Sequence, residues 1–280
     1  MKVLVLSDVH GGRWKAVELI EQVEPDVIAI PGDLPSSIDV PVLALSYAKG
    51  RRSSYISNAY ERFIERLTFR QIRTAKRLLV DLTSLDIPVL LIHGNTETSE
   101  TRTWMRLFCS RYPNFHWIAD RSVKIDGVQF FGHGWVGVED DYDRARTPGE
   151  IPAIESEKIL KRQIKKLSYD VDKTVLISHA PPYGTNLDFL PHKGIHAGSK
   201  PVRKAMNSRK VDINISGHLH EAYGSYWSKK WWGINAGSVI EDIACTADLE
   251  TGEITWFRHV VNKIGISSFL YRRRNQAGYD

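Results

Sequence analysis

Seven polar side chains follow short apolar runs in this sequence, and all seven are oxygen or imidazole donors. They are Asp8, His10, Asp33, Asn95, His179, His218 and His220. Carboxylate, amide and imidazole groups suit Mn, Fe, Zn, Co or Ni, whereas a structural zinc site would be rich in cysteine. Seven donors are more than one tetrahedral ion takes, and they suffice for two ions that share a bridging carboxylate. The residue types therefore predict a dinuclear metal centre with positions left for water and substrate.

Two pairs of these donors are separated by a single residue. In Asp8-Val9-His10 and in Gly217-His218-Leu219-His220, alternate residues of an extended segment would face the same side, so each pair would point to one place. Glycines precede three of the donors, at Gly32, Gly94 and Gly217. Because glycine adopts backbone angles that other residues avoid, we expect a sharp turn at each of these positions.

The elements that must position these donors are short buried strands. Apolar runs that stop at Gly, Asp, Asn or His occur at Val3–Leu6, Val27–Ile30, Val89–Ile92, Val175–Ile177 and Ile213–Ile215. A helical pattern between the first two runs makes a βαβ unit, so these strands are expected to be parallel. The carboxyl ends of parallel strands lie along one edge of a sheet, and sites form there. We therefore expect one site built from five loops.

The second half of the chain has a different pattern. Short aromatic or β-branched segments, separated by turns, occur at 128–131, 222–227, 231–234, 243–247 and 254–260. This spacing is typical of antiparallel pairing. Together with the first half, it predicts an α/β fold with two mixed β-sheets packed as a sandwich flanked by helices. No repeat or low-complexity linker divides the chain, so residues 1–280 are expected to form a single domain.

Residues 35–86 form a longer segment than one crossover helix needs. Part of it has helical spacing, and it is rich in basic residues: Lys49, Arg51, Arg52, Arg62, Arg66, Arg70, Arg73, Lys76 and Arg77. We interpret it as a helical insertion that could cap the site. Its basic face is either solvated or contacts nucleic-acid phosphates, with nearby tyrosines available for stacking on bases.

The composition excludes several classes of protein. The 280 residues are 42% hydrophobic and 25% charged, which rules out disordered, collagen-like and coiled-coil chains. No apolar run approaches the roughly 20 residues that span a membrane, and Asp8 interrupts the first run too early for a signal peptide. Cys109 and Cys245 form no CxxC motif, so we expect no disulfide framework and a reducing, cytoplasmic location.

The donor motifs, taken in order, resemble those of the calcineurin-like metallophosphoesterase family. The resemblance covers Asp8-Val9-His10, Gly32-Asp33, Gly94-Asn95, His179 and Gly217-His218-Leu219-His220. It implies a two-sheet sandwich and two divalent ions, with Mn favoured over Fe, Zn, Ni or Co. It also implies that Asp8, His10 and His220 bind the first ion. Asn95, His179 and His218 would bind the second ion, and Asp33 would bridge the two. A hydroxide between the ions would then attack the phosphorus of a phosphate ester.

The third motif departs from the family pattern, which is usually Gly-Asn-His. Here Thr96 stands in place of the histidine that is credited with protonating the leaving group or contacting phosphate, next to the catalytic candidate Asn95. A threonine hydroxyl is too weak an acid for that step, although it can donate a hydrogen bond to phosphate. Family members without this histidine resemble diesterases, so a phosphodiesterase is predicted. A phosphomonoesterase, a nuclease and a non-catalytic scaffold on the same fold are the alternatives.

Five further residues are candidates for roles around the centre. His133 could serve as the missing acid or be a loop histidine without chemistry, and Arg13 could reach a phosphate or be solvated. Tyr183 lies on the rigid turn after His179. His196 and Ser199 precede a helical pattern, where Ser199 could help to bind an anion or simply cap the helix. The expected partner is a phosphate-ester substrate, either a small molecule or nucleic acid. No membrane is expected. The arginines at 272–274 are interpreted either as an exposed tail or as a contact between copies of the chain.

Overall fold

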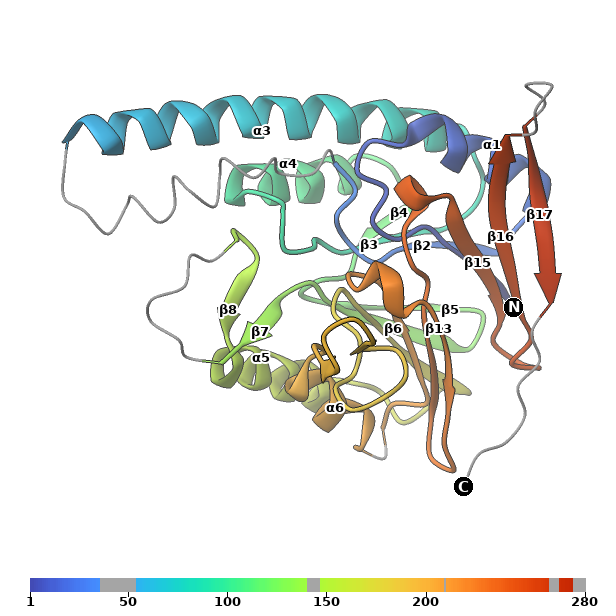
Figure 1. The fold of residues 1–280 in the computed structure, drawn as a ribbon. Helices are drawn as coiled ribbons and strands as arrows, with labels where there is room; N and C mark the ends of the chain where they lie inside the picture. The colour runs from blue at the N-terminus through green and yellow to red at the C-terminus, as the bar shows by residue number, and fades with distance from the viewer. Residues whose placement is uncertain (36–53, 140–146, 209, 262–266, 274–280) are drawn as a thin grey trace.

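Two large β-sheets stack against each other in this protein, with helices on both outer faces (Figure 1). The computed structural model describes residues 1–35, 54–139, 147–208, 210–261 and 267–273. In these residues two further pairs of short strands lie outside the large sheets, and the predicted sandwich of mixed sheets is confirmed.

The first sheet has seven strands in the order β17-β16-β15-β1-β2-β3-β4. Its bounds are β1 Lys2–Val5, β2 Val27–Ile30, β3 Val89–Leu91, β4 Phe115–Trp117, β15 Ile243–Asp248, β16 Ile254–Val261 and β17 Ser267–Arg273. Strands β1 to β4 are parallel to one another, as predicted for the first two of them. Strand β15 pairs with β1 in the antiparallel sense, and β16 and β17 extend that half of the sheet.

The second sheet has six strands in the order β13-β14-β12-β9-β6-β5. Its bounds are β5 Ser122–Ile125, β6 Val128–His133, β9 Lys173–Ser178, β12 Ile213–Ser216, β13 Gly224–Trp227 and β14 Trp232–Asn235. The small pairs are β7 Val136–Val138 with β8 Glu150–Pro152 and β10 Phe189–Leu190 with β11 Ile195–His196.

The antiparallel prediction for the second half is wrong at two places. Strand β6 runs parallel to β9, and β14 runs parallel to β12. Helix α5 crosses over between β6 and β9, which brings the chain back in the same direction. Strand β13 takes the edge of the sheet, and the chain then returns through β14 between β13 and β12. The remaining pairs of these segments, β13–β14 and β15–β16, are antiparallel as predicted.

Helices cover the outer faces of both sheets. They are α1 Arg13–Val23, α3 Ser54–Leu82, α4 Ser99–Cys109, α5 Ala153–Lys165 and α6 Lys200–Met206, with short 3₁₀ turns η1 His220–Ala222 and η2 Val239–Glu241. Figure 1 shows α1, α3 and α4 along the first sheet and α5 and α6 along the second. None of these helices is long and apolar enough to cross a membrane within the described residues.

Alternation along the strands explains why the sandwich has two cores. In β6, Phe130 faces the large core shared by the two sheets, whereas Phe131 faces the smaller core under α5 and α6. In β9, Ile177 and Leu176 divide in the same way. Successive residues of a strand point to opposite faces, so a continuous apolar run buries both faces of a central strand.

The predicted helical insertion contains α3, whose C-terminal half belongs to the large core. Ala75, Leu78, Leu79 and Leu82 are buried there. The basic residues Lys49, Arg51 and Arg52 lie outside the described residues, as do the arginine at 274 and the positions that follow it. Whether residues 35–86 cap the site stays a prediction.

Candidate metal centre

The loops that follow five strands meet where the two sheets come together. Backbone hydrogen bonds join the first two loops, from Asp8 N to Gly32 O at 3.3 Å and from His10 N to Asp33 O at 3.0 Å. Another joins Gly217 N to His179 O at 3.0 Å. The five runs therefore supply two sheets rather than one: β1, β2 and β3 lie in the first, and β9 and β12 in the second. The predicted single site is assembled across the seam between them.

The backbone of these loops is left-handed rather than extended. Asp8, His10 and Asp33 have φ of 48°, 44° and 49°, and His218 has φ of 71°. The predicted alternation of an extended segment is therefore wrong for both donor pairs, and His220 lies in the 3₁₀ turn η1. Non-glycine residues at positive φ are strained and cluster at functional sites. Here the left-handed backbone directs the side chains of Asp8 and His10 toward the same place.

Only one of the three glycines is needed for its backbone angle. Gly32 has φ of +99°. Gly94 is needed for space, because a Cβ there would lie 2.7 Å from His179 Cε1 and 2.7 Å from Asp33 N. Gly217 is needed for the same reason, because its Cβ would overlap Asp8 and lie 2.7 Å from Ser7 Cβ. These two glycines let the ligand loops approach closely.

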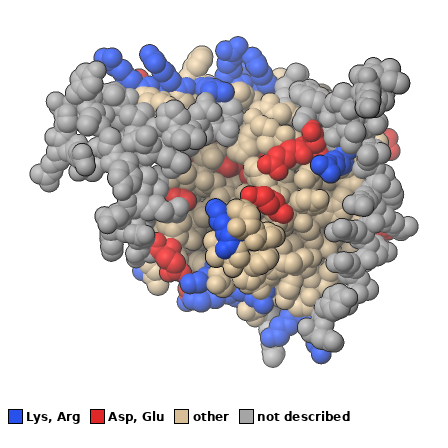
Figure 2. All heavy atoms as spheres, in the orientation of Figure 1, with Lys and Arg blue, Asp and Glu red and all other residues tan. Residues whose placement is uncertain are grey.

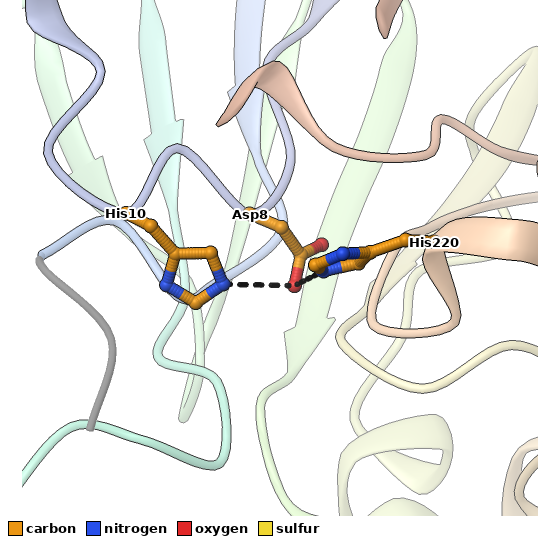
Figure 3. Close-up of side chains that lie close together, drawn as sticks. All are labelled: Asp8, His10 and His220. Atoms are coloured by element: carbon orange, nitrogen blue, oxygen red, sulfur yellow. Dashed lines mark ion pairs between the residues drawn. The ribbon is translucent and has the colours of Figure 1, made fainter. Parts of the chain in front are cut away.

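Asp8, His10 and His220 form a first group of possible ligands (Figure 3). Asp8 Oδ1 lies 3.9 Å from His10 Nε2 and 3.3 Å from His220 Nε2. This buried oxygen has no hydrogen-bond partner among the described residues. The other oxygen, Oδ2, accepts from His218 N at 2.8 Å and from the Ser7 hydroxyl. One carboxylate oxygen is thus fixed by hydrogen bonds while the other faces two imidazoles.

A second group is built around His179. Its Nδ1 lies 2.8 Å from Pro31 O and must donate to it, because a backbone carbonyl can only accept. Its Nε2 lies 2.9 Å from the amide oxygen of Asn95. The amide nitrogen of Asn95 donates to Thr147 Oγ1 at 3.1 Å, which assigns Oδ1 to the side of His179. His179 Nε2 and Asn95 Oδ1 are therefore neighbouring donor atoms that one cation could bind together.

Asp33 lies between the two groups. Its Oδ2 is 4.0 Å from His10 Nε2 and 3.6 Å from His179 Nε2. Its Oδ1 accepts from the backbone N and the hydroxyl of Thr96, at 3.0 and 2.8 Å. Asp8 also takes part in both groups, since its ligand atoms cluster with those of Asp33 and His179. The donor set and its orphaned acceptor atoms fit divalent ions.

The electrostatics favour positive charge at this place. Burial alone would raise the pKa of both Asp8 and Asp33, but nearby histidines outweigh it and hold both pKa values below the ordinary range. Burial would lower the pKa of His220, yet Asp8 and Glu241 raise it to about 9. Desolvation and the neighbouring His179 lower the pKa of His218 to about 4. Two carboxylates are therefore anionic at neutral pH, and His220 would have to give up a proton to bind a divalent ion.

Two glutamates support the ligands and were missed by the sequence analysis. Glu241 accepts from His220 Nδ1 at 3.0 Å, which directs Nε2 toward Asp8. Glu97 is fully buried and accepts from Gly94 N at 2.8 Å and Leu34 N at 3.2 Å, joining the loops after β3 and β2. Burial and the charge of Asp33 raise the pKa of Glu97 well above its ordinary value. Glu97 stands in the third motif, whereas no sequence signal marks Glu241.

The other predicted site residues have different surroundings. His133 is fully buried, its Nε2 lies 2.8 Å from Ser156 Oγ, and burial lowers its pKa to about 3, so it has no exposed edge. The hydroxyl of Ser199 caps α6 by accepting from Val202 N at 3.3 Å. Tyr183 and His196 are exposed neighbours with ring centroids 5.7 Å apart. Arg13 begins α1, and its side chain lies outside the described residues.

Comparison with known proteins assigns the family. The family model described as calcineurin-like phosphoesterase matches residues 1–222. An uncharacterised protein of Methanocaldococcus jannaschii is 30% identical over 138 residues, which are 48% of this chain and 56% of that protein. The match thus spans little more than half the length of that relative.

Two solved structures share the fold at low sequence identity. A protein of Thermus thermophilus superposes with a TM-score of 0.60 at 16% identity, covering 92% of this chain and 98% of that one. A dimetal phosphatase from Danio rerio superposes with a TM-score of 0.54 at 12% identity, covering 91% and 95%. The family model matches most of the sequence, and these structures share the fold of the chain. The chain therefore belongs to the calcineurin-like phosphoesterase family.

Proposed function

We propose that this protein is a metal-dependent phosphoesterase that hydrolyses phosphodiesters in the cytoplasm. The observation that carries the proposal is the pair of ligand groups that share Asp8, in which carboxylate, amide and imidazole atoms converge and one buried oxygen of Asp8 has no hydrogen-bond partner among the described residues. Such an arrangement is suited to holding cations and is costly without them. The family match supports phosphate esters as the substrate class.

The ligand assignment follows the two groups. Asp8, His10 and His220 would hold one ion, with Asp33 between this group and His179. His179 would hold the other ion together with Asn95, 2.9 Å from its Nε2, and with His218, whose ring centroid lies 4.8 Å from that of His179. Two bound ions, with Mn favoured, would supply positive charge that lowers the pKa of water, so that hydroxide is the nucleophile, and that neutralises the phosphate oxygens. Glu241 and the carbonyl of Pro31 orient His220 and His179, each through Nδ1.

The preference for diesters rests on Thr96. Its hydroxyl and its backbone N both donate to Asp33, so its side chain holds a ligand instead of supplying an acid. A phosphomonoester carries an additional charge, and its efficient hydrolysis in relatives is credited to the histidine that is missing here. We therefore expect the centre to favour phosphodiesters, which have one ionised oxygen fewer than phosphomonoesters.

A nuclease is the second candidate function, and the exposed basic face of α3 favours it. Arg62, Arg66, Arg73 and Lys76 are all exposed along this helix. Figure 2 shows Lys and Arg gathered at the edge of the molecule where α3 lies. Contacts between such residues and phosphates make binding strongly dependent on salt. A small-molecule diesterase would lack that dependence.

The test is an activity panel on metal-stripped protein. The protein is reloaded with Mn, Fe, Zn, Ni or Co and offered an aryl diester, an aryl monoester, cyclic nucleotides and single-stranded DNA. We expect turnover only after loading, and faster cleavage of the diester. Asp33→Asn should abolish it and lower the bound metal, whereas Asp120→Asn, at an exposed ion pair with Arg106, should change neither. Full activity of the Asp33 variant at normal metal content would overturn the assignment.

A further inference from the structure

A buried carboxylate fixes one exposed histidine in the β10–β11 hairpin. Asp188 is fully buried and accepts backbone hydrogen bonds from Thr185 N at 2.8 Å, Gly198 N at 3.0 Å and Gly184 N at 3.1 Å. His196 Nδ1 lies 2.8 Å from Asp188 Oδ1. An ionised carboxylate only accepts, so Nδ1 carries a hydrogen and Nε2 is the outward atom of the ring.

The outward edge of His196 is available to a substrate. Its side chain is 37% exposed, and Nε2 has no hydrogen-bond partner in the part of the chain that the structure describes. The ring lies beside Tyr183 and Phe189, with centroids 5.7 and 5.2 Å away. These rings and Asp188 restrict rotation of the imidazole. A histidine that is held on one nitrogen and free on the other is arranged to act at that second nitrogen.

Several contacts tie the segment that carries this histidine to the loops of the candidate centre. Ser199 N donates to Pro181 O at 2.8 Å, so the segment after His196 runs beside the turn that begins at His179. Strand β10, which pairs with β11, packs against η1, which begins at His220. The amide of Asn235 donates to Leu187 O at 3.0 Å and to Leu219 O at 2.8 Å. The hairpin is thus tied to the loops of three ligand histidines.

From this arrangement we infer that His196 is the proton donor to the leaving group, and that Asp188 is its positioning residue. The inference rests on the proposed function. It fills a role that Thr96, whose hydroxyl donates to Asp33, and His133, which is buried, leave open. As hydroxide forms a bond to phosphorus, the bond from phosphorus to the leaving oxygen breaks. That oxygen takes the Nε2 proton of the imidazolium, which becomes neutral, keeps its Nδ1 hydrogen on Asp188 and is reprotonated from water.

The test uses diesters whose leaving groups differ in basicity. A weakly basic leaving group such as p-nitrophenolate needs no proton, whereas phenolate and an alkoxide do. His196→Gln should therefore lower kcat on the phenyl and alkyl esters by about 10²- to 10⁴-fold, the range for general acid catalysis, and change the p-nitrophenyl rate little. His192→Gln, at an exposed histidine of the same hairpin loop, should leave all rates unchanged.

A second readout does not depend on turnover. In protein labelled with ¹⁵N-histidine and loaded with zinc, the His196 signals are those lost in His196→Gln. The ¹⁵N chemical shifts of His196 should show that Nδ1 carries a hydrogen. Addition of inorganic phosphate should change the chemical shift of Nε2. Asp188→Asn should remove the Nδ1 preference and reproduce part of the loss on phenyl esters.

The outcomes separate the two proposals. Two results together would overturn the role of His196. In His196→Gln, kcat would fall by the same factor on all three esters or on none of them, and phosphate would not shift the Nε2 signal. The proposed phosphoesterase function would be unaffected by these results. If the parent protein, fully loaded with metal, cleaves none of the esters, the proposed function fails and the role of His196 fails with it.

Discussion

Replacing Glu241 by glutamine should weaken one of the two proposed metal sites and leave the other unchanged. Glu241 accepts from His220 Nδ1 at 3.0 Å, so it fixes the tautomer whose Nε2 faces Asp8. A glutamine of the same shape loses the negative charge and can present an N–H to the ring. The ring is then free to adopt the wrong tautomer or to turn.

The size of this effect follows from the exposure of the pair. Removing a residue that orients a ligand histidine costs about 10- to 100-fold in metal affinity. The side chain of Glu241 is 51% exposed and that of His220 is 22% exposed, so water weakens the interaction between them. We therefore expect the lower end of the range, about 10-fold, which corresponds to about 1.4 kcal/mol.

Calorimetric titration of the metal-stripped protein with Mn²⁺ or Zn²⁺ measures this. We expect two binding steps in the parent, of which only one weakens in Glu241→Gln. Glu221→Gln is the matched control, because it removes an exposed carboxylate from the same 3₁₀ turn as His220. Unchanged affinity for both ions in Glu241→Gln, or equal weakening of both, would refute the reasoning that Glu241 acts through His220 alone.

Three further predictions concern other parts of the structure. Thr96→His should raise the rate on monoesters relative to diesters, and a ratio equal to that of the parent would remove the basis for a diester preference. Gly217→Ala should lower the free energy of unfolding in urea by about 1–3 kcal/mol, since its Cβ would overlap Asp8 and approach Ser7 Cβ to 2.7 Å; unchanged stability would contradict the packing. Cys109 and Cys245 are buried, which raises the pKa of Cys109 to about 12 and that of Cys245 further, so neither should react with a thiol reagent until the protein unfolds.

The buried strands and the donors after them could be predicted because both signals are local. The apolar run 27–30 is strand β2 at those bounds, and the donors that follow the runs come together in the structure. Their distribution over two sheets could not be predicted, because pairing of β1 with β2 and of β9 with β12 is a property of distant segments. The same holds for β14, whose parallel neighbour β12 is set by the edge position of β13.

The parts of the site that the sequence did not reveal depend on contacts between distant residues. Glu241 lies 21 residues beyond His220 and reaches it through η2, which no spacing rule connects to a ligand. The sequence predicts an extended backbone at Asp8 and His10, because neither residue type demands a positive φ. The structure has a left-handed backbone at both positions. His196 was predicted near the substrate, but its fixed orientation comes from Asp188, which the sequence did not single out.

The proposed ligands come from loops of both sheets, so a bound ion would link the two layers of the sandwich. Asp8, Asp33 and Asn95 come from the first layer, and His179 and His218 from the second. Separation of the two sheets would pull coordinating atoms away from the metal. Metal binding and the packing of the two sheets are therefore expected to be coupled. An ion that binds only the folded protein, with its two sheets packed together, adds its binding free energy to the stability of that state. Removal of the metal by a chelator would accordingly weaken the contact between the two sheets.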